Sequence, residues 1–221
     1  MKGRLSILAL LIACTACNGA TIDTTTMSVT LGTTTTLIPT TTQSTSDVPE
    51  GFELFESADG FQVSLPSRWV PLDLSVGDLE SVLDELGESM DPETIEFIRE
   101  SLASGVDFSL FAIDIAGDPN VNVIVVPRTP LDTPDNLEDL LPVQLEELLG
   151  VTILSTDRVE HGGLDGVRIA YLAEFPDGVA EGHQYYMVGD DSVFIFSFTS
   201  FDPDSHRDDF PRVMETFRPT G

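Results

Sequence analysis

Three histidines and two cysteines are the residues of this 221-residue chain best suited to catalysis or metal binding. None of His161, His183 and His206 has a second histidine four residues away, as the helical zinc-binding motif requires. The sequence also lacks a serine in a Gly-x-Ser-x-Gly arrangement and a glycine-rich phosphate-binding loop. It therefore predicts no catalytic residue, no metal site and no cofactor.

Two of the histidines have structural explanations. His161 precedes two glycines in a faint likeness of an esterase oxyanion loop, but without a serine nucleophile the segment is predicted to be a turn. His183 alternates with Tyr185 and Met187 on a predicted strand. There it could line a pocket or form a hydrogen bond near the strand end, and we favour the hydrogen-bonded role.

His206 lies within an acidic cluster formed by Asp202, Asp204, Asp208 and Asp209. The spacing of the four carboxylates differs from that of an EF-hand calcium loop. Acidic side chains also stabilise the N-terminus of a helix, and this role is preferred here to a cation site.

The start of the chain carries signals for export. Lys2 and Arg4 precede an apolar run over residues 5–13, which is shorter than the roughly 20 residues that span a bilayer. Leu11 to Cys14 then resembles the bacterial lipobox, with leucine three residues before a cysteine and alanine just before it. The resemblance implies a signal peptide at residues 1–13 and acyl chains on Cys14. Cys17 is the poorer candidate, because Cys14 would occupy its leucine position.

Residues 14–49 are predicted to be the lipidated cysteine and a disordered tether. Threonine occupies half of positions 21–46, and few residues there could form a core. Residues 50–221 are predicted to form one globular domain.

The charge of the chain is strongly negative, with 38 acidic residues, 10 basic residues and a formal net charge of −28. Such a surface repels nucleic acid and anionic lipid headgroups. Lys2 is the only lysine, so the domain cannot use lysine as a nucleophile or base.

Turn residues divide the domain into strands and helices. A hairpin is predicted at Asp59–Gly60 between strands at 52–55 and 61–65. Further strands are expected at 108–115, 121–126, 151–159, 167–173, 183–188 and 193–201. Amphipathic helices are expected at 78–88, at 91–102, at 133–149 with Pro142 kinking or splitting it, and from Ser205 onward with Asp208 as a capping partner.

The strand that begins at Val193 is apolar or small at successive positions, so both of its faces should be buried. It is expected to pair antiparallel with residues 183–188, and Phe217 is expected to pack from the last helix onto the sheet. The predicted fold class is α+β: a mostly antiparallel sheet with helices on both faces, an α/β/α sandwich.

This order of elements resembles the PsbP-like sandwich family and, together with the lipobox, the LpqN-type envelope lipoproteins. The shared features are an opening hairpin followed by Pro66 and Trp69, a strand at 121–126, and a late aromatic hairpin that leads to a helix ending near Phe217. The sequence departs from the family at Arg68, where a glycine usually precedes the tryptophan. The resemblance covers most of residues 50–219 and implies an accessory, binding or assembly role.

We therefore expect a non-enzymatic accessory or binding protein of the bacterial cell envelope. Acyl chains on Cys14 would hold it to the membrane outside the cytoplasm, and its partner would be an envelope protein or a small ligand, not nucleic acid. Two alternatives stay open. One is a lipid or small-molecule carrier with an apolar cavity beneath the helices at 78–102, and the other is a hydrolase with an unrecognised site.

Overall fold

The structure is a computed structural model that describes residues 48–72, 108–114, 119–175, 178–206 and 208–220. The predicted signal peptide, Cys14, most of the tether and the helices expected at 78–88 and 91–102 lie outside the described residues. In the described part, no helix is both long and apolar enough to cross a bilayer.

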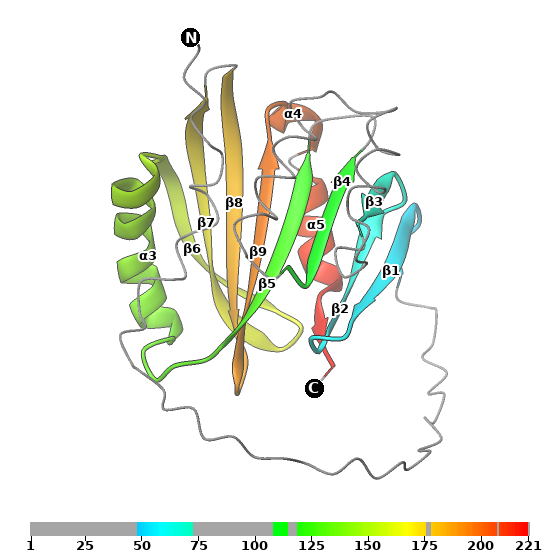
Figure 1. Ribbon diagram of the computed structural model, residues 1–221, viewed down its shortest axis with the longest axis horizontal. Coiled ribbons are helices and arrows are strands. Elements are labelled where there is room, and N and C mark those ends of the chain that lie inside the picture. Colours follow the sequence, from blue (N-terminus) through cyan, green and yellow to red (C-terminus); the bar gives the residue numbers. More distant parts are fainter. Residues whose placement is uncertain (1–47, 73–107, 115–118, 176–177, 207, 221) are drawn as a thin grey trace, which may run out of the picture.

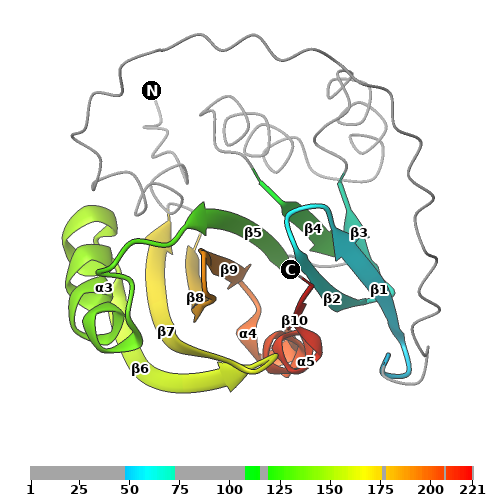
Figure 2. The same cartoon turned by 90° about the horizontal axis from the view of Figure 1, so that it is seen from below.

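The described strands form two antiparallel sheets, with two longer helices and one short helix (Figures 1 and 2). The strands are β1 (Phe52–Ser57), β2 (Phe61–Pro66), β3 (Trp69–Pro71), β4 (Leu110–Asp114), β5 (Asn120–Pro127), β6 (Thr152–His161), β7 (Leu164–Phe175), β8 (Gly178–Val188), β9 (Ser192–Ser200) and β10 (Arg218–Pro219). The helices are α3 (Pro134–Leu149), α4 (Pro203–His206) and α5 (Asp209–Thr216). The large sheet has the order β3-β4-β5-β9-β8-β7-β6, and the small sheet has the order β1-β2-β10.

β9 occupies the middle of the seven-stranded sheet and pairs antiparallel with β8 on one side and β5 on the other. Its side chains alternate between the two faces of the sheet. Phe194, Phe196 and Phe198 belong to one core cluster, whereas Val193 and Ile195 belong to the other. The prediction of a central strand buried on both faces is confirmed.

The first core cluster lies between the large sheet, the small sheet and α5. Phe61 of β2 and Phe217, which follows α5, are both fully buried there. The ring centroid of Phe217 lies 5.1 Å from that of Phe196 and 5.4 Å from that of Phe194. Phe217 therefore packs onto the sheet as predicted, and the opening hairpin helps to cover the same face.

The second core cluster lies beneath α3 at the β6–β7 end of the opposite face (Figure 1). Leu137, Leu141 and Leu145 form the buried stripe of this helix. The hydroxyl of Thr133 accepts a hydrogen bond from the backbone N–H of Asn136, which caps the start of the helix. Pro142 lies inside α3, and the helix continues through it to Leu149 rather than splitting.

Two parts of the predicted fold need correction. The helix expected from Ser205 is two elements, because α4 ends at His206 and α5 begins at Asp209. Asp208 is the N-cap of α5 but makes no side-chain capping hydrogen bond. The sandwich is confirmed only in part: α3 covers one end of one face, and the opposite face is covered by a second sheet as well as by α5. The hairpin and β10 form that second sheet, because β2 pairs with β1 on one side and with β10 on the other.

Candidate functional site

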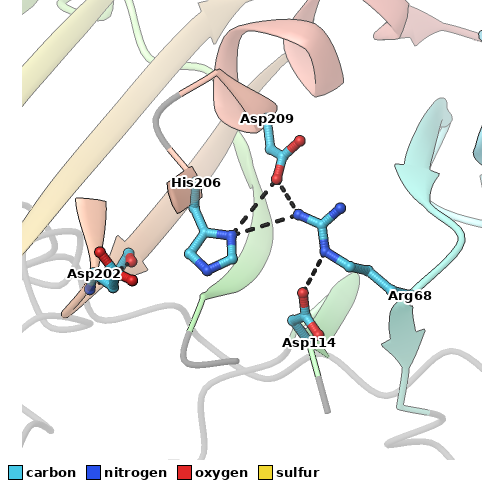
Figure 3. A network of polar contacts seen from close by, with 6 residues as sticks. Arg68, Asp114, Asp202, His206 and Asp209 are labelled. Carbon is cyan, nitrogen blue, oxygen red and sulfur yellow. Dashed lines mark hydrogen bonds and ion pairs between the residues drawn. The ribbon is translucent and has the colours of Figure 1, made fainter. Parts of the chain in front are cut away.

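Arg68 is the centre of a polar network at one edge of the domain (Figure 3). It lies in the turn between β2 and β3, directly before Trp69, whose strand partner is Asp114 at the end of β4. The guanidinium donates to the carboxylate of Asp114 and to that of Asp209 at the start of α5. The network therefore joins the β3–β4 edge of the large sheet to the C-terminal helix.

Both carboxylates are largely shielded from solvent, and this decides what Arg68 does. The Asp114 and Asp209 side chains are 2% and 13% exposed, whereas the Arg68 side chain is 45% exposed. A buried carboxylate is costly without a cationic partner. Burial lowers the pKa of Arg68, but the hydrogen bond to Asp114 and the charge of Asp209 outweigh this effect and raise it. The guanidinium is thus committed to two acids in the domain, which suits a structural clamp rather than an anion site.

His206 completes the network at the end of α4. Its Nδ1 lies 3.5 Å from a terminal nitrogen of Arg68 and 3.7 Å from a carboxylate oxygen of Asp209. The acidic cluster predicted from the sequence is therefore divided by the fold. Asp209 faces Arg68 and is partly buried, whereas Asp202, Asp204 and Asp208 are exposed.

A second polar pair is buried inside the domain on β8. Nε2 of His183 lies 2.8 Å from a carboxylate oxygen of Glu181, and both side chains are at most 9% exposed. The ring of Phe210 from α5 meets the imidazole edge-to-face at a centroid distance of 5.4 Å. The predicted hydrogen bond of His183 is confirmed, but the residue lies in the middle of β8 rather than near a strand end. This pair is also the group best suited to accept a proton, because an imidazole held by a carboxylate is a recurrent general base.

Ser200 is the serine nearest to this pair in the sheet register. It lies directly across from Glu181 on β9 and is fully buried. Its hydroxyl accepts a hydrogen bond from the backbone N–H of Asp202. The hydroxyl thus helps to turn the chain from β9 toward α4.

His161 ends β6 and is followed by Gly162 and Gly163, both with positive φ, before β7 begins. Two such residues are what a tight type I′ hairpin turn requires, so the predicted turn is confirmed. Burial lowers the pKa of His161, and the nearby Glu215 opposes this effect. The imidazole lies against the ring of Tyr185 at a centroid distance of 5.8 Å.

Among the described residues, no group of three histidine, cysteine or acidic side chains is arranged to hold a metal ion. Cys14, the predicted lipidation site, lies outside those residues. Sequence reasoning missed Arg68 as the centre of a network. The sequence carries no local signal for this network, because Asp114 and Asp209 lie 46 and 141 residues from Arg68 along the chain.

No protein-family model matches the chain, and no curated protein shows significant sequence similarity to it. Its fold is similar to that of the cyanobacterial PsbP protein CyanoP from Synechocystis sp. PCC 6803. The two share 13% sequence identity with a TM-score of 0.51, over 80% of this chain and 97% of CyanoP. This likeness confirms the predicted PsbP-like fold and says nothing further about function.

LpqN, which is involved in cell envelope biogenesis of Mycobacterium tuberculosis, has a weaker likeness to the chain. The TM-score is 0.48 at 12% identity, over 73% of this chain and 83% of LpqN.

Proposed function

We propose that this chain is a lipid-anchored, non-enzymatic accessory protein that binds a partner in the bacterial cell envelope. The order of features at its N-terminus carries the proposal: a positive start, an apolar run, and Leu11-Ile12-Ala13-Cys14. Two or three acyl chains on Cys14 would give stable attachment, because a single chain holds a protein only marginally at a membrane.

The described domain supports the accessory role through the use of its few cations. Arg68 binds Asp114 and Asp209, and Arg168 of β7 binds Asp157 of β6. Arg158 of β6 binds two acids of α3, Asp135 and Glu138. These arginines hold secondary-structure elements together, so an acidic exterior is left for recognition.

The anchor is tested by metabolic labelling with a fatty acid that carries a chemical tag. Cys14→Ser should abolish labelling and release the chain from the membrane fraction. Cys17→Ser is the matched control, since it removes a thiol three residues away, and it should keep both label and location. Labelling that survives Cys14→Ser but disappears with Cys17→Ser would place the anchor at Cys17 and contradict the proposed site.

Among the described residues, the Glu181–His183 pair is the observation that favours the hydrolase alternative. The purified full-length chain should show no turnover of ester or peptide substrates, and His183→Ala should leave that background unchanged. Turnover that disappears in His183→Ala but persists in His161→Ala would replace the accessory role with an enzymatic one. The carrier alternative depends on the predicted cavity beneath residues 78–102, which lies outside the described residues.

A further inference from the structure

The exposed side of α3 carries apolar side chains among its acidic ones, where a solvent-facing helix surface is normally polar throughout. Leu137, Leu141 and Leu145 bury the inner face, yet Leu140, Val143 and Leu148 are 54%, 51% and 56% exposed. Leu140 and Val143 are three residues apart and so share a helix face, and Asn136 lies on that face one turn before Leu140.

Leu131, in the loop before the helix, adds to this surface. Its side chain is 67% exposed, and its backbone carbonyl accepts a hydrogen bond from the Asn136 side-chain amide at 2.9 Å. The contact holds the loop against the first turn of α3. We call Leu131, Leu140 and Val143 the α3 patch.

Acidic side chains border the α3 patch. Asp139, Glu146 and Glu147 are exposed on the helix, and α3 has no basic residue. Arg158 binds Asp135 and Glu138 instead. Within the described part of the chain, none of the three bordering acids forms an ion pair.

These charges decide what can cover the α3 patch. A second copy in a two-fold contact would place the same acids against each other, and anionic lipid or nucleic acid would also be repelled. A wholly apolar partner would leave carboxylates desolvated without a counter-charge. A protein surface with an apolar centre and a lysine- or arginine-rich border matches both the apolar and the acidic residues.

We propose that the outer face of α3 is the docking site for a cationic, amphipathic protein segment. This rests on the partner-binding half of the proposed function and not on the anchor. α3 and β1 lie at opposite ends of the domain in both views (Figures 1 and 2), so a matched control surface is available. β1 carries the exposed Leu54, which follows the exposed Glu53 and precedes the exposed Glu56 by two residues.

The probe is a fluorescent 18-residue helical peptide of leucine and lysine at amphipathic spacing, and its binding to the purified full-length chain is followed by anisotropy. Leu140→Gln with Val143→Gln keeps good helix formers on α3 while removing the apolar contact. It should weaken binding by about tenfold, the effect expected when two half-exposed aliphatic side chains lose their burial. Neutralising the border with Asp139→Asn, Glu146→Gln and Glu147→Gln should weaken binding and flatten its salt dependence.

The control is Leu54→Gln combined with Glu53→Gln and Glu56→Gln, which should change the affinity by less than about twofold. Equal loss in the charge-neutralised α3 variant and in the β1 variant would mean that the peptide responds to net charge alone, and this would overturn the docking site. Absence of binding at low salt would overturn it as well. Fatty-acid labelling of Cys14 separates the two proposals: labelling without peptide binding rejects the docking site alone, and peptide binding without labelling rejects the anchor alone.

Discussion

Gly182 on β8 makes room for the ring of Tyr171, its direct partner on β7, and this contact gives a sharp test of the packing. A Cβ at position 182 would fall inside 3.0 Å of the ring and hydroxyl of Tyr171. Tyr171 is fully buried in the cluster beneath α3, so its ring cannot move aside without leaving that core. Gly182→Ala should therefore destabilise the domain.

The size of the loss follows from the two ways to relieve the overlap. Moving the ring outward gives up the burial of an aromatic side chain, and forcing β7 and β8 apart disturbs the ladder that runs from Gly166–Met187 to Phe175–Gly178. Overpacking of this kind costs about 1–3 kcal/mol. Without the overlap, alanine would instead stabilise a strand by roughly 0.5–1 kcal/mol relative to glycine, so the sign of the change tests the argument.

The assay is urea and thermal unfolding of the full-length chain, followed by circular dichroism. A loss of 3 kcal/mol, at the upper end of that range, should lower Tm by about 6–12 °C for a domain of this size. Gly189→Ala is the matched control, because its Cβ would meet its nearest neighbour at 3.1 Å and should cost less. If Gly182→Ala is as stable as the unsubstituted chain, Tyr171 does not pack against β8 as described.

Phe217→Ala, with Phe201→Ala as its control, tests the core, and His161→Gln tests an ionisable group. Phe217→Ala should cost about 3–5 kcal/mol in unfolding free energy, because a fully buried ring that contacts Phe61, Phe194 and Phe196 is lost. Phe201→Ala, at a residue that is 43% exposed, should cost less than half as much in the same denaturation experiment. Because burial depresses the pKa of His161 below 6.5, the folded state binds the proton less well than the unfolded state. The free energy of unfolding should therefore be highest above pH 6.5 and fall as the pH drops through the folded-state pKa of His161. His161→Gln should remove this pH dependence. An NMR titration that gives His161 a pKa above 6.5 would contradict the expected direction of the shift.

Much of the large sheet could be predicted because its strands carry strong local signals. The apolar run in β9 required burial on both faces, and the glycine pair after His161 required a tight turn. The start of α3 could also be predicted, since Thr133 is a favoured N-cap residue and Pro134 is favoured in the first turn of a helix.

The hairpin of the second sheet was predicted from Asp59–Gly60, but its pairing with β10 could not be, because β10 is far from β2 in sequence. β10 at Arg218–Pro219 is too short to have a periodicity, and its pairing with Gln62 and Phe61 of β2 is a tertiary event. The division of the last helix was missed for a related reason. Ser205 and Asp208 have capping-box spacing, but Asp209 forms an ion pair with Arg68 at the point where α5 begins.

The same contrast explains why the candidate site was only half visible in the sequence. Asp114, Asp209 and Arg68 come from three distant segments, and nothing local to any one of them indicates the other two. Their chemistry follows from a global property of the chain, which has 38 acidic residues but 10 basic ones. Acids so outnumber cations that one cation can serve two carboxylates, and the planar fork of arginine can bind two where the point charge of lysine is less suited to do so. Arg68 and Arg158 both bind two acids, whereas Arg168 binds Asp157. That pattern gives a physical reason for a domain that uses arginine alone.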